Sequence, residues 1–186
     1  MVKTKTSFIR IGNKIIVETS PAIAKDRLEA GTYSLLYDPY KGTFAFEELN
    51  FKNDSILPLP SPEFEKVINQ MSLFMSPNIK SKFKDFGYLY KRGILLHGNP
   101  GTGKTIITTR ITEKAVQDYN AICLFVENIA ALKKAYEFLN ESQPEQLLVV
   151  VFEEFDRLAE DSEEDLLLLL DGQIQRDSVI FLATTN

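Results

Sequence analysis

Apolar positions divide the chain into two regions of different texture. In residues 1–57 they form short runs rich in β-branched and aromatic residues, whereas beyond residue 93 continuous apolar runs alternate with segments of four-residue apolar spacing. The first pattern is typical of a small sheet, and the second of buried parallel strands separated by amphipathic helices. The pattern predicts a small β-rich N-terminal domain (1–57), a proline-rich linker and helical lead-in (58–92), and an α/β core (93–186).

Short β-like runs make up most of the N-terminal region. The turn residues Gly12–Asn13 and the segment 38–42 separate neighbouring runs, as expected of hairpins. Their aromatic side chains favour cross-strand packing in a small sheet over a ligand-stacking surface. The predicted strands are 7–11, 14–18, 31–37 and 42–48.

The lead-in begins with prolines and continues with helical periodicity. Prolines between residues 57 and 62 stiffen the chain, and Ser61 suits the N-cap of a helix whose apolar positions run from 64 to 75. A second, shorter helix is predicted over 78–86, ending at Gly87. Its basic side chains favour a solvated face over a nucleic-acid contact. They are Lys80, Lys82, Lys84 and the following Lys91 and Arg92.

Continuous apolar runs of strand length recur in the core. Each is followed by a helix-like segment, and helices are predicted after residue 103, over 130–139 and over 161–171. Strand–helix alternation at this spacing predicts a doubly wound parallel α/β sheet, with any ligand at the carboxyl ends of the strands. The four predicted strands are 93–97, 121–126, 147–152 and 178–184.

A glycine-rich octet follows the first core strand and precedes a predicted helix. Its spacing, G-x-x-x-x-G-K-T, is that of a phosphate-binding P-loop. Backbone N–H groups of such a loop, together with the N-terminus of the next helix, surround a polyphosphate. The octet therefore predicts that the chain binds a nucleoside triphosphate. Its residues are Gly98, Asn99, Pro100, Gly101, Thr102, Gly103, Lys104 and Thr105.

Four side chains are candidates for the chemistry of the site. Two lie within the octet, and two follow the third core strand. Lys104 is expected to neutralise β- and γ-phosphate charge, and the Thr105 hydroxyl to ligate Mg²⁺. Glu153 and Glu154 follow the third core strand, where burial would be costly without a metal or a donor. We expect Glu153 to hold the metal shell and Glu154 to orient or deprotonate the attacking water. An ordinary acidic loop is the alternative.

Composition and charge add limits on location and partners. The chain has 186 residues, of which 44% are apolar, and a net charge of −5, which argues against an extensive nucleic-acid surface. Cys123 is expected to be a buried, reduced thiol. No secretory leader pattern or bilayer-length apolar run is recognisable, so the sequence predicts a cytoplasmic protein without a membrane partner.

Four motifs in order resemble an AAA+ ATPase. They are Gly98–Thr105, Val149–Asp156, Leu169–Gly172 and Ala183–Asn186, which resemble Walker A, Walker B, the Leu-Asp-Gly helix end and sensor 1. The match covers about residues 62–186, and the lead-in 90–96 is similar to the group that includes the mitochondrial Rieske-protein translocase. The resemblance implies ATP and Mg²⁺ as ligands and a homo-oligomeric ring. It also implies that Asn186 positions the lytic water near the γ-phosphate.

The chain departs from the family pattern in three places. Glu153 stands where the family usually has Asp, and the segment 126–129 lacks the aromatic-hydrophobic-Gly pore loop of unfoldases. The sequence ends on Asn186, ahead of the family's arginine finger, sensor 2 and lid, so the core is interpreted as incomplete. Loss of an arginine finger costs a factor on the order of 10³–10⁵ in rate. We therefore expect weak Mg·ATP binding and little turnover from this chain alone.

The residues leave more than one function open. The leading hypothesis is the core of an AAA+ ATPase, whose hydrolysis remodels a protein or nucleic-acid client selected by the N-terminal domain. The alternative is a nucleotide-dependent binding or assembly module with little or no hydrolysis. A P-loop kinase for a small molecule is disfavoured by the Leu-Asp-Gly and Ala-Thr-Thr-Asn motifs. His97, Asp156 and Arg157 are interpreted as packing or locally pairing residues rather than catalytic groups.

Overall fold

The structure is a computed structural model that describes residues 7–11, 13–18, 27–51, 62–171 and 176–186. Three sequence-based expectations lie outside these residues. They are the prolines before residue 62 with the Ser61 cap, the Gly12 half of the first turn, and the Gly172 helix end.

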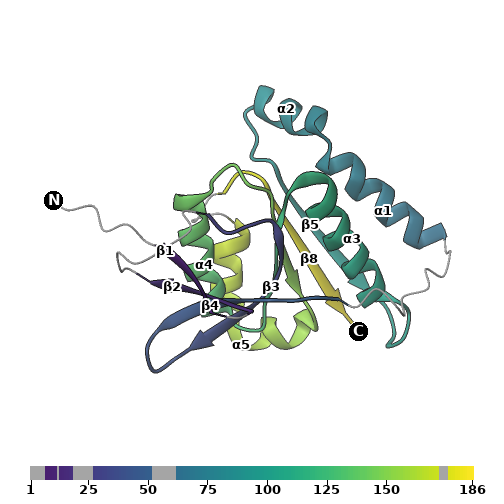
Figure 1. The fold of residues 1–186 in the computed structure, drawn as a ribbon. Coiled ribbons are helices and arrows are strands. Elements are labelled where there is room, and N and C mark those ends of the chain that lie inside the picture. Colours follow the sequence, from purple (N-terminus) through teal and green to yellow (C-terminus); the bar gives the residue numbers. More distant parts are fainter. Residues whose placement is uncertain (1–6, 12, 19–26, 52–61, 172–175) are drawn as a thin grey trace.

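Strands and helices occupy most of the described chain (Figure 1). Their order and type agree with the sequence pattern, and their ends shift by a few residues. The strands are β1 (Ser7–Ile11), β2 (Lys14–Glu18), β3 (Gly31–Asp38), β4 (Thr43–Glu48), β5 (Lys91–His97), β6 (Ile122–Phe125), β7 (Leu148–Phe152) and β8 (Val179–Thr185). The helices are α1 (Pro62–Met75), α2 (Pro77–Asp85), α3 (Lys104–Tyr119), α4 (Ile129–Ser142) and α5 (Phe155–Asp171).

The described strands form one eight-stranded sheet in the order β1-β2-β4-β3-β6-β7-β8-β5. Pairing is parallel from β3 through β6, β7 and β8 to β5, and antiparallel among β1, β2, β4 and β3. Helices cover both faces of the parallel part (Figure 1). The predicted α/β, doubly wound architecture is confirmed, and the sheet as a whole is mixed.

Alternation along the buried strands divides the core into two layers. Within β7, Leu148, Val150 and Phe152 pack with α4 and α5, while Val149 and Val151 pack with α1 and α3. Every residue of β7 and of β8 is buried, as a strand covered on both faces requires. This packing fixes β7 and β8 side by side, so the residues that follow each of them emerge at one end of the sheet.

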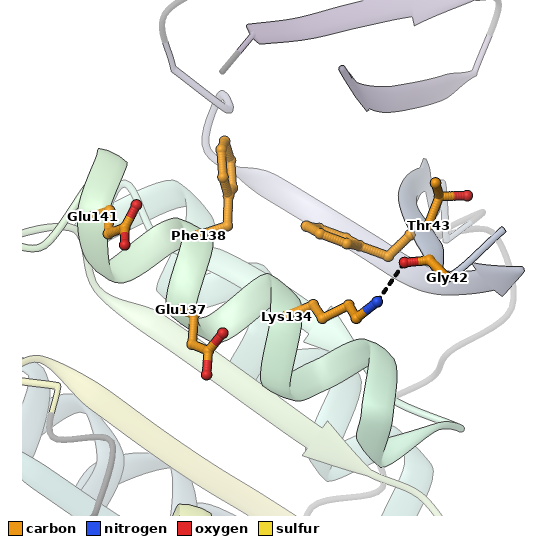
Figure 2. Close-up of a pocket in the computed structure, with 7 residues that line it drawn as sticks. Gly42, Thr43, Lys134, Glu137, Phe138 and Glu141 are labelled. Atoms are coloured by element: carbon orange, nitrogen blue, oxygen red, sulfur yellow. Dashed lines mark hydrogen bonds between the residues drawn. The ribbon is translucent and has the colours of Figure 1, made fainter. Parts of the chain in front are cut away.

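The N-terminal strands continue the same sheet. Gly31–Ser34 of β3 pairs in parallel with Ile122–Phe125 of β6, and Tyr33 and Phe46 belong to the same core layer as α4. A cavity of about 330 Å³ lies between α4 and the segment Gly42–Phe44, where the β3–β4 turn leads into β4. Figure 2 shows Lys134 reaching across it to donate to the Gly42 carbonyl. The division of the chain into domains at residues 57 and 92 stays a prediction.

One helix differs from its predicted extent. A helix was expected to begin at Asp161–Ser162, but α5 begins at Phe155, and Ser162 interrupts it with φ −150° and ψ 34°. The apolar periodicity predicted only the second half of α5, because the buried residues Leu166 and Leu169 lie there. The first half lies directly after Glu153 and Glu154, so it brings α5 to the end of β7.

Candidate functional site

The glycine-rich octet forms the connection between β5 and α3. Gly101 and Gly103 have left-handed φ angles of 80° and 87°, and Gly103 is the N-cap of α3. Side chains with a Cβ rarely adopt such angles, so these two positions require glycine. Gly98 N–H donates to the Thr185 carbonyl at 3.3 Å, which ties the start of the loop to the end of β8.

The N-terminus of α3 is open to an anion. Among the residues that the structure describes, no side chain caps this helix by a hydrogen bond, and its first turn contains no acidic residue. The first N–H groups of a helix have no partners within the helix, and together with the helix dipole they favour a negatively charged group. The local geometry fits a phosphate.

Lys104 lies within the octet and contacts both sides of the site. Its ammonium donates to the Gly98 carbonyl, to the Asn99 carbonyl at 3.2 Å and to Asn186 Oδ1 at 2.9 Å. Lys104 and Asn186 are 82 positions apart in the sequence, and the parallel pairing of β5 with β8 brings them together. The Lys104 ammonium therefore already lies at the cavity, where a bound phosphate could accept a hydrogen bond from it.

The two adjacent glutamates follow β7 at the same end of the sheet. Glu154 has a left-handed φ of 51°, and its N–H donates to Thr184 Oγ1 at 3.3 Å. Its carboxylate accepts a hydrogen bond from Arg157 at 2.8 Å. This backbone conformation is strained for residues other than glycine, and strained residues of this kind are often found at functional sites. Both glutamates line the cavity at this end of the sheet.

The charge of Glu153 is disfavoured by its surroundings. Its side chain remains exposed, yet partial desolvation raises the pKa of its carboxyl, and the Glu154 and Glu127 carboxylates raise that pKa further. Because a bound cation would offset each of these effects, Glu153 is suited to lie beside a metal ion.

A single cavity of about 430 Å³ collects most of the predicted site residues. Of those predicted, Gly98, Asn99 and Thr102 do not line it. The carbonyls of Gly98 and Asn99 instead accept from Lys104, and the Thr102 hydroxyl donates to the Asn99 carbonyl at 2.8 Å. The lining residues are Pro100, Gly101, Gly103, Lys104, Thr105, Ile106, Glu153, Glu154, Thr184, Thr185 and Asn186.

Sequence reasoning missed one part of this site. Asp156 accepts a hydrogen bond from the Thr185 hydroxyl and lies 3.5 Å from the Asn186 backbone nitrogen, so it reaches from α5 to the end of β8. Thr184 and Thr185 also line the cavity. Their position inside the Ala-Thr-Thr-Asn motif was a usable signal, whereas the partner of Asp156 lies 29 positions away and leaves no local pattern.

A comparison with known families matches residues 94–186 to the family described as "ATPase family associated with various cellular activities (AAA)". This match spans β5 to Asn186, the whole segment that builds the cavity. The chain belongs to the AAA family.

Two curated relatives are ATPases by name. The chain is 30% identical over 131 residues to "ATPase family gene 2 protein" of Schizosaccharomyces pombe, covering 61% of this chain and 16% of that protein. It is 28% identical over 124 residues to "ATPase histone chaperone YTA7" of Saccharomyces cerevisiae, covering 56% of this chain and 9% of that protein. The chain thus spans less than a fifth of these relatives' length.

Matches among solved structures include the Caenorhabditis elegans protein PCH-2. That match has a TM-score of 0.47 and 20% identity, and it covers 68% of this chain and 37% of PCH-2. A second match, to a structure of Drosophila ORC bound to DNA and Cdc6, has a TM-score of 0.40 and 14% identity, covering 74% of this chain and 32% of the other.

Within the described residues, no helix has the length and apolar character needed to cross a membrane.

Proposed function

We propose that the chain is the nucleotide-binding core of an ATP hydrolase. The observation that carries this proposal is the shared cavity, in which Lys104, Glu154 and Asn186 come together from three separate strand ends. An open helix N-terminus, an ammonium, a hydroxyl and two carboxylates form the set of groups that binding a triphosphate requires. Membership of the AAA family supports ATP as the nucleotide.

Binding is assigned to the octet and α3. Backbone N–H groups around Gly101 and Gly103 donate to phosphate oxygens, and the Lys104 ammonium donates to the γ-phosphate while it keeps its contact with Asn186 Oδ1. Ammonium groups have three donors and no acceptor, so Lys104 can keep one loop carbonyl while it contacts the nucleotide.

Thr105 and Glu153 are assigned to the metal. Both line the cavity, and hydroxyl and carboxylate oxygens are ligands that Mg²⁺ accepts. Mg²⁺, when bound with the triphosphate, would supply Lewis-acid polarisation of the phosphate oxygens. The raised pKa of Glu153 fits this assignment, because a nearby cation favours the ionised carboxylate.

Glu154 and Asn186 are assigned to the attacking water. The water oxygen forms a bond to the γ-phosphorus as the bond to the bridging oxygen breaks, and Glu154 accepts the proton that the water loses. Asn186 holds this water or a γ-phosphate oxygen through its amide. Arg157, which pairs with Glu154, must release it for this role, and an exposed pair of this kind costs at most about 1 kcal/mol to separate.

The proposal also includes assembly into a ring and remodelling of a client. A homo-oligomeric ring in the cytoplasm, acting on a protein or nucleic-acid client through the N-terminal strands, fits the family, in which "ATPase histone chaperone" is one relative's name. The chain by itself is proposed to bind Mg·ATP weakly and to turn it over slowly. A nucleotide-dependent assembly module with little hydrolysis is the second candidate, favoured by Glu153 in place of the usual aspartate and by the Arg157–Glu154 pair.

Nucleotide binding and hydrolysis can be tested separately with two variants. Lys104→Ala is expected to weaken Mg·ATP binding at least about tenfold, because it removes the only charged donor that the octet supplies. Glu154→Gln is expected to retain ATP binding within about threefold and to lose whatever turnover the chain has. Calorimetry with ATP and release of inorganic phosphate are the two measurements.

Lys114→Ala is the matched control, because Lys114 lies on the same helix as Lys104 but pairs with Asp118 outside the cavity. It should change neither measurement. Slow phosphate release that Glu154→Gln leaves unaltered would favour the assembly module. Phosphate release at about 1 s⁻¹ from the unmodified chain would contradict the proposed slow turnover. Mg·ATP binding that Lys104→Ala leaves unchanged would contradict the proposed nucleotide site.

A further inference from the structure

Asp156 connects the start of α5 to the end of β8. Its carboxylate accepts the Thr185 hydroxyl with Oδ1, and its Oδ2 lies 3.5 Å from the Asn186 backbone nitrogen. Thr185 is 8% exposed, so its hydroxyl requires a partner within the protein. Since carboxylates form stronger hydrogen bonds than neutral acceptors, this contact holds the last residues of β8 in a defined position.

The neighbouring threonine makes a second contact with the same turn. Thr184 Oγ1 accepts from Glu154 N–H at 3.3 Å, so two consecutive residues of β8 hold the segment 154–156. That segment carries the proposed base, Glu154, and is followed by α5. Asn186 is thereby placed by contacts from α5 as well as by the strand pairing of β8.

The Asn186 amide has one orientation in this arrangement. Lys104 has only donors, so the atom facing it at 2.9 Å must be the amide oxygen. The amide nitrogen then remains the donor for an oxygen in the cavity that Asn186 lines. A shift of the Asn186 backbone would move both atoms at once.

We propose that Asp156 is a positioning residue that makes the site distinguish ATP from ADP. It does so by holding Thr185 and Asn186 where the Asn186 amide meets the γ-phosphate, the group that ADP lacks. This inference rests on the proposed function, since it requires the cavity to hold a nucleotide. It gives Asp156 a role that its local sequence does not indicate.

A purely structural role would have a different signature. Asp156 lies in the first turn of α5, where a negative charge interacts favourably with the helix dipole. Removing that charge would destabilise α5 without regard to which nucleotide is bound. Thr185→Val separates the two roles, because it removes the hydroxyl that Asp156 holds, nearly preserves side-chain shape, and leaves the first turn of α5 intact.

The experiment measures affinity for ADP and for the non-hydrolysable β,γ-imido analogue of ATP, each with Mg²⁺, in the 186-residue chain. Asp156→Ala and Thr185→Val are each expected to weaken the triphosphate analogue about 3- to 10-fold while ADP affinity changes less than about twofold. Asp156→Asn retains an acceptor oxygen and should recover most of the triphosphate affinity. Glu160→Gln removes another exposed carboxylate from α5 and should change neither affinity.

Each outcome has a distinct meaning. Loss of triphosphate affinity in both Asp156→Ala and Thr185→Val, with ADP retained, supports the positioning role. Equal weakening of both nucleotides, no weakening, or an effect of Asp156→Ala without one of Thr185→Val overturns it. Failure of the unmodified chain to bind either nucleotide would instead contradict the proposed function, so the two failures are distinguishable.

Discussion

Gln143 offers a quantitative test of how the N-terminal strands are attached to the core. It lies just after α4, is 1% exposed, and its side-chain amide makes two hydrogen bonds to the backbone of Leu28. Leu28 N–H donates to Gln143 Oε1 at 2.7 Å, and Gln143 Nε2 donates to the Leu28 carbonyl at 3.0 Å. Gln143→Leu introduces an apolar side chain of similar volume and removes both contacts, together with the hydrogen bond from Gln143 Nε2 to Gln146 Oε1 at 3.1 Å.

The cost follows from the buried groups left behind. Leu28 is 2% exposed, so the substitution leaves one N–H and one C=O without their partner, at about 1–3 kcal/mol each. Water can recover part of this, because Leu28 also borders an open cavity of about 430 Å³. We expect the free energy of unfolding to fall by about 2–4 kcal/mol and the melting temperature by about 5–12 °C.

Urea denaturation followed by circular dichroism measures this loss, with Gln117→Leu as the control. Gln117 is an exposed glutamine on α3, and its substitution should change stability by no more than about 0.5 kcal/mol. A loss below about 0.5 kcal/mol for Gln143→Leu would refute the reasoning. It would show that the Leu28 contact contributes little to the attachment of the N-terminal strands.

Two further predictions concern titratable groups. Because the folded state raises the pKa of Glu153, it binds that proton more tightly than the unfolded chain does, and stability falls as pH rises through the interval between the unfolded and folded pKa values. Glu153→Gln should therefore raise the melting temperature of the nucleotide-free protein more at pH 7 than at about pH 4, where the Glu153 carboxyl is mostly protonated; equal shifts at both pH values would contradict this cause. Cys123 is fully buried, its thiol lies 3.6 Å from the Thr112 carbonyl oxygen, and burial raises its pKa, so alkylation by iodoacetamide at pH 8 should be slower by a factor of about 100 or more than in urea. Comparable labelling rates in buffer and in urea would show that the core around β6 opens readily in the folded protein.

Much of the site could be predicted from local sequence. The octet Gly98–Thr105 is a contiguous pattern, and the run Leu148–Phe152 is continuously apolar because both faces of β7 are buried. Brief motifs of this kind identify strand ends, and parallel strands bring their carboxyl ends to one edge. That rule predicts that Glu153 and Glu154 lie near the octet, and the resemblance to AAA+ ATPases added Asn186 to the predicted site. Lys104, Glu154 and Asn186 line one cavity.

Contacts between distant segments could not be predicted in the same way. The N-terminal strands were expected to form a small sheet of their own, and the structure pairs β3 with β6, whose residues lie about 90 positions later. Nothing in the local pattern of residues 31–34 indicates a parallel partner, since the same alternation suits a hairpin. Asp156 was interpreted as a local pairing residue because its Thr185 partner is separated by the whole of α5 and β8.

The sequence by itself determined the class of fold, the glycine-rich loop and the acidic residues that follow β7. These depend on periodicity and short motifs, which act over one strand or one turn. Tertiary structure alone decided that Lys104 meets Asn186, that Asp156 holds the end of β8, and that the N-terminal strands extend the core sheet. Each of these contacts depends on which strands become neighbours, and that choice is made by the packing of the whole sheet between its helices.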